Sequence, residues 1–421
     1  GIRLSKKVRD GLSATADERT PEQQKELGKY YRENVTGPIQ LAQTARDVAQ
    51  KSLEAYRGRV SSAMVMKEGK PREAFVLRRG EYDKRGESVG PGLPAFLPPL
   101  SDGEEANRLS LARWIVSRDN PLTARVWVNR IWERFFGVGL VKTSENLGSQ
   151  ASYPTHPELL DWLAADFMES GWDMKRFIKQ LVTSRVYQQA SVVSPEALMK
   201  DPENILFART SRIRLPAEIV RDVALDTSGL LVKKIGGPSV RPWMPDGVWD
   251  ETSKYGNLRG YKPATNEDRY RRSMYTIWKR TAGPPTMLLF DAPNRETCTV
   301  KRSRTNTPLQ ALALLNEITF VEAAHGLAQR MLTEGGSVPA DRISFGFQRA
   351  LGRKPSKEEL QTLEDGLAAD LNFFQSDTHA AEQLSKVGVV PAPKDIPLPD
   401  YAAYTLVANV LLNLDEFIMR E

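Results

Sequence analysis

The chain has 421 residues, of which 40% are hydrophobic and 27% are charged, with 59 Lys and Arg against 53 Asp and Glu. This composition is ordinary for a folded protein and excludes a largely disordered chain. One cysteine excludes an internal disulfide framework and a cysteine-rich zinc site, and three histidines leave little for a histidine-based metal centre. The net charge of +6 is mild beside that of proteins that grip phosphate backbones, so we expect no nucleic-acid partner.

The N-terminal residues are polar and helical in pattern, so we predict a helical hairpin over residues 1–60 that ends an upstream region. Thr20-Pro21-Glu22-Gln23 is typical of a helix start, because threonine and glutamine can each accept the other's backbone N–H. Residues 61–104 are predicted to form a small β-hairpin and a connector rich in Pro and Gly. The hairpin prediction uses two short apolar runs, at 63–66 and 74–77.

Residues 105–190 carry the strongest helical pattern. Asn120-Pro121 predicts a helix start, and a glycine at 137 predicts the end of that helix. Thr155-His156-Pro157-Glu158 predicts a second start with a capping box, and Asp173 predicts a third. This density of helix signals indicates a helical bundle.

The C-terminal half is mixed but mostly helical in pattern. We predict a strand over Arg272–Trp278 and one long helix from Thr307 to about Leu332. Two further helices are predicted to be capped by Ser356 and Asp400.

The predicted fold class is mainly α. It consists of a helical bundle over 105–421, with small β elements near 61–80 and 240–280 and long irregular connectors. No run approaches about 18 apolar residues, so we expect no membrane span.

Two motifs in the helical region are long and specific: Asn120 to Trp132, with the sequence NPLTARVWVNRIW, and Pro154 to Trp162, with the sequence PTHPELLDW. Three shorter blocks accompany them, at 236–239, 290–296 and 305–312. Over most of its length the sequence resembles the planctomycete-specific domain family, an uncharacterised domain of large extracytoplasmic proteins.

The resemblance implies an extracytoplasmic location, in the periplasm or at the cell surface, and upstream domains of the cytochrome c type as partners. We therefore expect the sequence to be the C-terminal part of a longer protein. Covalent haem attachment needs a Cys-x-x-Cys-His site, and Cys298 is the only cysteine. Haem is thus expected only on an upstream domain that is absent from this sequence.

One candidate ligand site lies within the two long motifs and contains Arg125, Asn129 and His156. The arginine fork suits a carboxylate or sulfate, and asparagine can donate and accept, which favours a pocket for an anionic or polyhydroxyl ligand. The alternative is a buried polar network that fixes helix packing, with Arg125 paired to Asp161 or Glu145. For His156, which stands between a capping threonine and a helix-starting proline, capping is the simplest role.

The preferred candidate site lies in residues 269–310, where cations alternate with aromatic residues. Trp278 is predicted as a stacking platform for a sugar, with the ligand held by the polar and charged residues that follow it. These are Arg280, Asp291, Asn294, Arg295 and Arg304. The alternative is a solvated strand face followed by a salt-bridged loop.

Catalytic residues are less clearly indicated. Asp291 and Glu296 are candidates for the two carboxylates of a glycoside hydrolase, which need a separation of about 5–9 Å that the sequence does not define. His156 is a third catalytic candidate. We expect no cofactor in this chain, while a Ca²⁺ site made of loop oxygens stays open.

Three functions follow from these patterns. The leading hypothesis is a module of an extracytoplasmic, cytochrome-linked protein that binds or processes polysaccharide, with a polysaccharide or an anionic glycan as its ligand. The first alternative is a scaffold that docks the upstream cytochrome-like domains or a partner subunit. The second is a glycoside hydrolase that uses two carboxylates.

Overall fold

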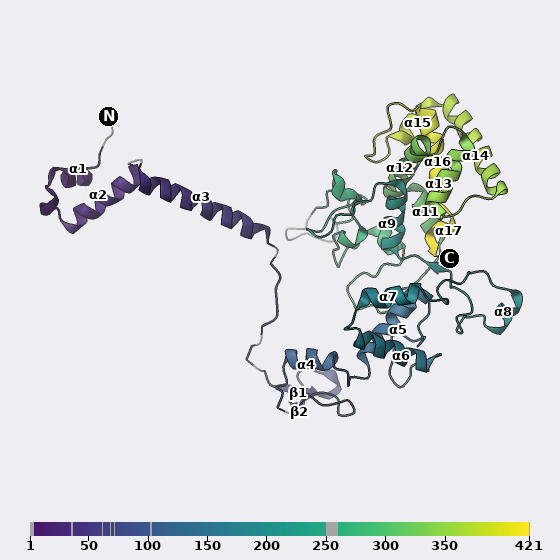
Figure 1. Cartoon of the computed structure of the whole chain (residues 1–421), viewed down its shortest axis with the longest axis horizontal. Helices are drawn as coiled ribbons and strands as arrows, with labels where there is room; N and C mark the ends of the chain where they lie inside the picture. Colours follow the sequence, from purple (N-terminus) through teal and green to yellow (C-terminus); the bar gives the residue numbers. More distant parts are fainter. Residues whose placement is uncertain are drawn as a thin grey trace. The chain divides into compact units, whose positions relative to one another are not determined.

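The computed structural model describes residues 4–34, 37–60, 62–67, 69–70, 72–101, 103–249 and 260–420. These residues form 17 α-helices and two two-stranded antiparallel sheets, which confirms the predicted mainly α fold (Figure 1). The chain divides into two compact units, Gly1–Pro91 and Gly92–Glu421.

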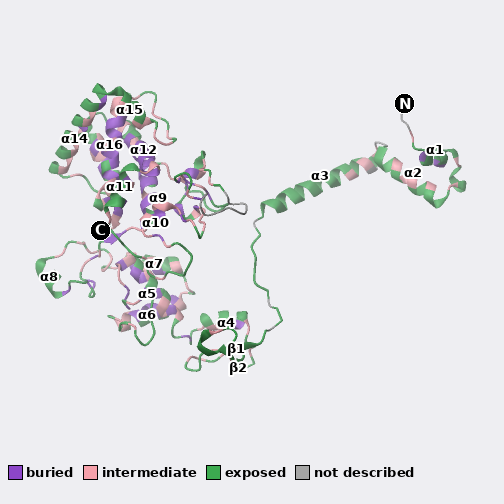
Figure 2. Ribbon diagram, turned by 180° about the vertical axis from the view of Figure 1, so that it is seen from behind, coloured by how far each residue is buried: buried purple, intermediate pink, exposed green. Residues whose placement is uncertain are grey.

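Three helices make up most of the first unit. They are α1 (Lys6–Ser13), α2 (Pro21–Asn34) and α3 (Pro38–Arg59). α1 packs closely on α2, since a Cβ at Gly11 would lie 3.1 Å from the Leu27 side chain. The capping box predicted at Thr20 is confirmed, because the Thr20 N–H donates to Gln23 at 3.0 Å and the Gln23 N–H to Thr20 at 3.3 Å. α3 is exposed along most of its length (Figure 2).

The hairpin of the first unit does not pair as predicted. β1 (Ala74–Leu77) pairs antiparallel with β2 (Arg85–Val89), whereas residues 63–66, the predicted partner, form no strand. The turn follows β1, where Arg79 and Gly80 adopt left-handed φ angles of 53° and 76°. The prediction placed the partner strand before residue 74. It was wrong because the backbone reverses direction after residue 77, so the partner strand follows β1.

Five helices open the second unit. They are α4 (Arg108–Ile115), α5 (Thr123–Phe136), α6 (Pro157–Glu169), α7 (Met174–Val182) and α8 (Pro195–Lys200). α6 and α7 pack on α5 and, together with the segment up to Phe207, enclose a hydrophobic core, here called the 124–207 core. Its centre is aromatic: the Trp132 and Phe136 rings stack at 4.0 Å, and Phe207 meets both edge-on at 5.2 and 5.8 Å.

The helix starts of this core differ in how well they were predicted. Asp173 caps α7 as expected, because its carboxylate accepts the N–H groups of Lys175 and Arg176. The capping box predicted at Thr155 is wrong. The Thr155 N–H donates to the Leu140 carbonyl at 2.9 Å, so this residue is held by the turn after α5, and His156 becomes the N-cap of α6 without a side-chain bond.

Nine helices build the rest of the second unit around a second core, here called the 217–418 core. They are α9 (Ala217–Ser228), α10 (Pro285–Leu289), α11 (Pro308–Asn316), α12 (Ile318–Glu334), α13 (Pro339–Leu351), α14 (Lys357–Ser376), α15 (Thr378–Ser385), α16 (Leu398–Asn413) and α17 (Asp415–Ile418). α12 and α16 pack on each other at the centre, with α9 against α12, and α14 and α15 against α16 (Figures 1 and 2). The capping box predicted at Ser356 is confirmed at the start of α14.

The long helix predicted from Thr307 to about Leu332 is broken at Glu317 into α11 and α12. Glu317 has an extended ψ of 134°, and its carboxylate accepts the N–H groups of Thr319 and Phe320 at 2.9 and 3.3 Å. Glu317 therefore caps a new helix, a role that its good helix propensity hides in the sequence.

The strand predicted over Arg272–Trp278 is also wrong, because its first half forms a 3₁₀ turn, Ser273–Tyr275. Another 3₁₀ turn, Glu267–Tyr270, precedes it. Arg269 and Arg271, the first two arginines of the cation–aromatic segment, are buried and only 5% and 2% exposed. Arg271 donates to the Lys234 carbonyl at 3.0 Å and its guanidinium lies 4.1 Å from the Tyr275 ring centre. Arg271 thus holds irregular backbone by binding its carbonyl groups, whereas Arg269 binds the Glu322 carboxylate.

A short sheet that the sequence did not predict joins distant segments. β3 (Ile213–Arg214) pairs antiparallel with β4 (Met419–Arg420), and the Arg420 side chain donates to the Phe135 carbonyl near the end of α5. The described residues of the 105–421 region therefore build two hydrophobic cores, where one bundle was predicted, and β3 and β4 lie at their junction.

Candidate functional site

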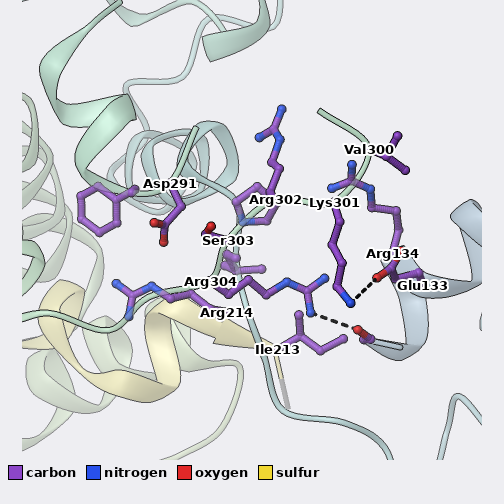
Figure 3. Close-up of a pocket in the computed structure, with 14 residues that line it drawn as sticks. Glu133, Arg134, Ile213, Arg214, Asp291, Val300, Lys301, Arg302, Ser303 and Arg304 are labelled. Atoms are coloured by element: carbon purple, nitrogen blue, oxygen red, sulfur yellow. Dashed lines mark hydrogen bonds and ion pairs between the residues drawn. The ribbon is translucent and has the colours of Figure 1, made fainter. Parts of the chain in front are cut away.

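A pocket of about 330 Å³ lies where β3, the C-terminal end of α5 and residues 290–304 meet. Figure 3 shows that side chains from these three segments point into it. The pairing of β3 with β4 and the bond from Arg420 to the Phe135 carbonyl hold α5 against this sheet. The pocket is therefore a product of the junction between the two cores.

Positive charge dominates this pocket. Its charged lining residues are the cations Arg134, Arg214, Lys301, Arg302 and Arg304 and the acids Glu133 and Asp291. In Figure 3, Arg304 and Lys301 extend toward Glu133 at one end, while Arg214 extends toward Asp291 at the other. Such an excess of cations, distributed over both ends of one pocket, attracts anions.

Arg214 is the most buried of these cations. It is 8% exposed, its Nη1 donates to Asn306 Oδ1 at 3.1 Å, and its guanidinium lies 5.6 Å from the Phe290 ring centre. Its Nη2 is buried and has no hydrogen-bond partner among the described residues. Burial lowers the pKa of Arg214, against the attraction of Asp291 and Asp415. This buried donor is therefore available for an acceptor on a ligand.

Arg304 and Lys301 contact residues at the C-terminal end of α5. Arg304 Nη1 donates to the Gly137 carbonyl at 3.3 Å, and Lys301 Nζ lies 3.8 Å from Glu133 Oε1. Burial lowers the pKa of Arg304, Glu133 opposes this, and the neighbouring cations Arg134 and Arg420 lower it further. The cations at this end of the pocket thus repel one another, which an anion would relieve.

Arg302 is already committed to a partner. Its Nη1 donates to Glu218 Oε2 at 2.7 Å, and both side chains are mostly buried. Burial acts to raise the pKa of Glu218, but the bond from Arg302, with attraction from Arg295, leaves it below its ordinary value. Because Glu218 already pairs with Arg302, we assign Arg302 a structural role in the pocket wall and no role in binding a ligand.

Asp291, one of the catalytic candidates from the sequence, organises the loop that carries Arg304. It adopts a left-handed φ of 63°, and its carboxylate accepts the Thr305 N–H at 2.7 Å and the Thr305 hydroxyl at 2.9 Å. The Thr305 hydroxyl in turn accepts a bond from buried Gln310 at 3.1 Å. The position of Arg304 is thus set by a chain of hydrogen bonds that reaches the start of α11.

A second, more open hollow of about 410 Å³ continues from the pocket. The two share Asp291 and the 301–303 segment as lining. The open part adds side-chain amide and hydroxyl groups, among them Asn294, Thr297 and Thr299. The two hollows therefore adjoin at these shared residues, and the open one adds neutral polar groups to the charged lining.

The structure brings together only part of the preferred site from the sequence. Asp291 and Arg304 line the pocket, and Asn294 lines its open extension, whereas Glu296 and Arg280 line neither. The guanidinium of Arg295 lies 4.3 Å from the Trp278 ring centre. Trp278 also donates to the Asn294 carbonyl at 3.1 Å. Arg295 therefore covers one face of the predicted stacking platform.

The other three candidates, Arg125, Asn129 and His156, lie on α5 and at the start of α6, around the 124–207 core. Arg125 Nε donates to Asp161 at 2.6 Å, a bond that lowers the pKa of that carboxyl, which is the pairing expected for a packing role. His156 Nδ1 lies 2.9 Å from the Thr155 hydroxyl, and its ring lies 5.6 Å from that of Phe207.

Asn129 is 1% exposed and acts as a buried clamp on the turn that follows α5. Its amide accepts the Val141 N–H at 2.8 Å and donates to the Val141 carbonyl and the Ser144 hydroxyl, both at 3.1 Å. Both ends of the amide are therefore used within the fold.

Replacing Asn129 with alanine is expected to lower the free energy of unfolding by about 1–3 kcal/mol, because three buried hydrogen bonds are lost and the Val141 N–H keeps no acceptor from this side chain. Urea denaturation measures this. The control is Asn316→Ala, whose exposed amide donates to the Leu312 carbonyl at 2.9 Å and should change stability by less than about 0.5 kcal/mol. Equal, small effects of both variants would contradict the clamp.

Residues 86–90 read Gly-Glu-Ser-Val-Gly, which matches the spacing of a hydrolase nucleophile elbow. That motif places its serine on a sharp turn between a strand and a helix. Here Ser88 lies within β2, opposite Phe75 of β1. The match is thus one of spacing without the structural context of an elbow.

Sequence reasoning missed Arg214 and Arg134. Neither belongs to the cation–aromatic segment, and Arg214 reaches the pocket only through pairing of β3 with the C-terminal β4. The alternation of Arg212, Ile213 and Arg214 is a weak strand signal that could have pointed to β3, but nothing local indicates its partner.

In the part of the chain that the structure describes, no group of three or more His, Cys, Asp or Glu side chains could hold a metal ion. No helix among these residues has the length and apolar character needed to cross a membrane. A protein-family model, PSD1, described as a protein of unknown function (DUF1553), matches residues 107–367, which include most of both cores. Neither a curated protein nor a solved structure matched the chain.

Proposed function

We propose that this chain, which belongs to the PSD1 family of proteins of unknown function (DUF1553), binds an acidic polysaccharide. The acidic groups of the ligand enter the cationic pocket, and neighbouring sugar units lie along its open extension. The observation that carries this proposal is Arg214, whose buried Nη2 lacks a partner among the described residues in a pocket with more cations than acids.

The charge argument follows from desolvation. A buried guanidinium with an unused donor is costly, and a carboxylate or sulfate supplies a charge-assisted hydrogen bond that removes that cost. Arg214 and Arg304 point to different ends of the pocket, so a ligand with spaced acidic groups uses both (Figure 3). This favours a polymer of acidic units over a single small anion.

The sugar argument follows from the open extension. Amide and hydroxyl side chains such as Asn294 and Thr299 donate and accept, as sugar hydroxyls require. The site is also longer than the cationic pocket alone, because the two hollows share lining residues. An acidic oligosaccharide therefore fits its charge, polarity and extent.

The wider context is part of the same proposal. We assign the protein to the planctomycete-type members of its family, with an extracytoplasmic location and cytochrome-like upstream domains. The motifs quoted from Asn120–Trp132 and Pro154–Trp162 support this by resemblance. A polymer-binding module outside the cytoplasm would meet such a ligand directly.

The test is a double variant, Lys301→Ala with Arg304→Ala, titrated with an oligogalacturonate, a dextran sulfate and neutral dextran. At least one acidic probe should bind the wild type, and the variant should bind it about 10- to 100-fold more weakly, as expected for lost charge-assisted bonds. Isothermal titration calorimetry gives the affinities. Thermal unfolding checks that both proteins are folded.

The matched control is Arg280→Ala, which removes an exposed arginine that lines neither hollow. It should bind within about twofold of the wild type, since non-specific charge attraction is all that it loses. An equal loss in the control and the double variant would overturn the pocket as the binding site. Release of reducing ends during titration would add the two-carboxylate hydrolase to the proposal.

A second function, docking of a partner domain, is favoured by helix α11. Two leucines of this helix face solvent: Leu309 and Leu312 are 62% and 56% exposed, whereas Leu314 on its other side is buried. Exposed leucines on one helix face indicate a protein contact. Failure of all three probes to bind would leave docking of cytochrome-like domains or a partner subunit as the better-supported function.

A further inference from the structure

A separate pocket of about 250 Å³ lies beside the turn that follows α5, and its lining differs from that of the cationic pocket. We propose that it binds an uncharged sugar unit of the same polysaccharide, so the inference rests on the proposed function for the identity of the polymer. No predicted site residue lines this pocket, although His156 adjoins it through Thr155.

An aromatic ring and a charge-balanced pair shape this pocket. The ring of Tyr153 is 83% exposed at its edge, while Phe207 and Ile205 form an apolar wall. Lys142 and Glu203, which also line it, form an ion pair with each other. The pair places a donor beside an acceptor without adding net charge.

This combination suits a neutral sugar ring. Sugar C–H faces pack against aromatic rings, and two neighbouring hydroxyls match a donor and an acceptor that lie side by side. An acidic sugar has less to gain here, because Glu203 already neutralises Lys142. The two pockets therefore select different units of one chain.

The walls of the pocket are held rigidly. At Gly139 a Cβ would lie 2.6 Å from the Val141 carbonyl oxygen and 2.8 Å from the Asn129 amide, so the turn accepts only glycine at this position. On the other side, Phe207 is held at a left-handed φ of 54°, which is strained for a bulky residue.

Hydrogen bonds in the 201–211 loop sustain that strain. The Asp201 carboxylate accepts the N–H groups of Ile205 and Leu206, both at 2.9 Å, and Asn204 donates to the Arg209 carbonyl at 2.8 Å. Because these hydrogen bonds already order the loop, the pocket wall that it forms loses little conformational entropy when a ligand binds.

The position of the pocket links it to the first site. Gly137 lines the cationic pocket, while the next two residues, Val138 and Gly139, line this one. Successive Cα atoms are about 3.8 Å apart, so both pockets border this one turn. Within the proposal, a polysaccharide chain with acidic and neutral units that passes over the turn contacts both pockets.

The test is Tyr153→Ala, titrated with neutral hexasaccharides of glucose, xylose and mannose and with oligogalacturonate. At least one neutral probe should bind the wild type with little dependence on salt, and Tyr153→Ala should bind it at least about tenfold more weakly. Oligogalacturonate should still bind this variant within about threefold of the wild type. Tyr82→Ala, which removes a ring that is 86% exposed in the first unit, is the matched control.

The double variant Lys301→Ala with Arg304→Ala separates the two proposals. It should keep its affinity for the neutral probe while it loses affinity for oligogalacturonate. Absence of neutral binding, or equal neutral binding by wild type and Tyr153→Ala, would overturn the second pocket and leave the first intact. Neutral binding that is lost in Tyr153→Ala, without any acidic binding, would support the second pocket and overturn the first.

Discussion

Replacing Glu322 with alanine is expected to lower the free energy of unfolding by about 3–5 kcal/mol, because it leaves Arg269 buried without a counter-charge. The side chains of Arg269 and Glu322 are 6% and 0% exposed, and Arg269 Nη2 lies 2.8 Å from Glu322 Oε1. Denaturant unfolding followed by far-UV circular dichroism measures the change.

Glu322 makes further contacts that increase the expected loss of stability. Its Oε1 also accepts the Val389 N–H at 2.8 Å. A Cβ at Gly388, whose φ is 81°, would lie 2.4 Å from the Glu322 carboxyl, so the backbone packs directly on this group. The carboxylate therefore joins α12 both to the 3₁₀ turns and to the segment after α15.

The matched control is Glu334→Ala, which removes the carboxylate from another Arg–Glu pair. Arg330 binds Glu334 through two bonds of 2.9 Å, but Glu334 is 47% exposed and Arg330 keeps its bond to the Thr227 carbonyl. An exposed pair contributes at most about 1 kcal/mol. If both variants lost the same small amount, the buried pair would not hold the fold as we argue.

These buried arginines explain why the 269–280 segment was misread. Alternating cations and aromatics have the same appearance in a sequence whether they face a sugar or the interior. Arg221, which no pattern singled out, donates to the carbonyls of Arg269 and Arg271 at 2.7 and 3.0 Å from within α9. Arginine is chosen for such contacts because its planar fork reaches several carbonyls at once.

Local signals predicted several helix caps but not all of them, since Pro397 is the N-cap of α16 and the predicted cap, Asp400, lies within its first turn. The caps at Thr20, Asp173 and Ser356 are confirmed, because a capping side chain binds backbone only two or three residues away. The break at Glu317 was missed because the same residue type favours a continuous helix as well as a cap. A cap can be predicted from the sequence when its residue type favours a capping position over the interior of a helix.

The candidate site was only partly predictable, since its residues meet through long-range contacts. Asp291 and Arg304 were found because they lie in one short segment. Arg214 could not be found, because its place in the pocket depends on β3 pairing with the last residues of the chain. Its unused Nη2 is likewise a property of burial, which spacing along a sequence does not encode.

Two buried titratable groups are expected to give opposing pH dependences of stability. Burial raises the pKa of Glu317 from 4.5 to about 7, against hydrogen bonds from Thr319 and attraction by Arg221. Burial lowers the pKa of His325 from 6.5 to about 4, against the Leu384 carbonyl. Each shift corresponds to about 3 kcal/mol, at about 1.4 kcal/mol per pKa unit.

The two signs follow from which state binds more protons. The folded chain holds a proton on Glu317 more tightly than the unfolded chain does. The stability that Glu317 contributes is therefore complete below pH 4.5 and is lost as the pH rises through 7. The folded chain holds a proton on His325 less tightly, and the stability that His325 contributes is therefore present above pH 6.5 and is lost as the pH falls through 4. Between pH 4.5 and 6.5 the two opposite changes of the free energy of unfolding with pH cancel in the wild type.

Single variants should separate these slopes. Relative to the wild type, Glu317→Gln, which keeps an acceptor for the Thr319 and Phe320 N–H groups, should gain about 3 kcal/mol as the pH rises from 4.5 to 7. His325→Gln should gain about 3 kcal/mol relative to the wild type as the pH falls from 6.5 to 4. Any packing cost of the histidine change is constant with pH, so only the slope is compared. Urea denaturation across this range measures both, and curves parallel to that of the wild type would show that neither group titrates as its burial requires.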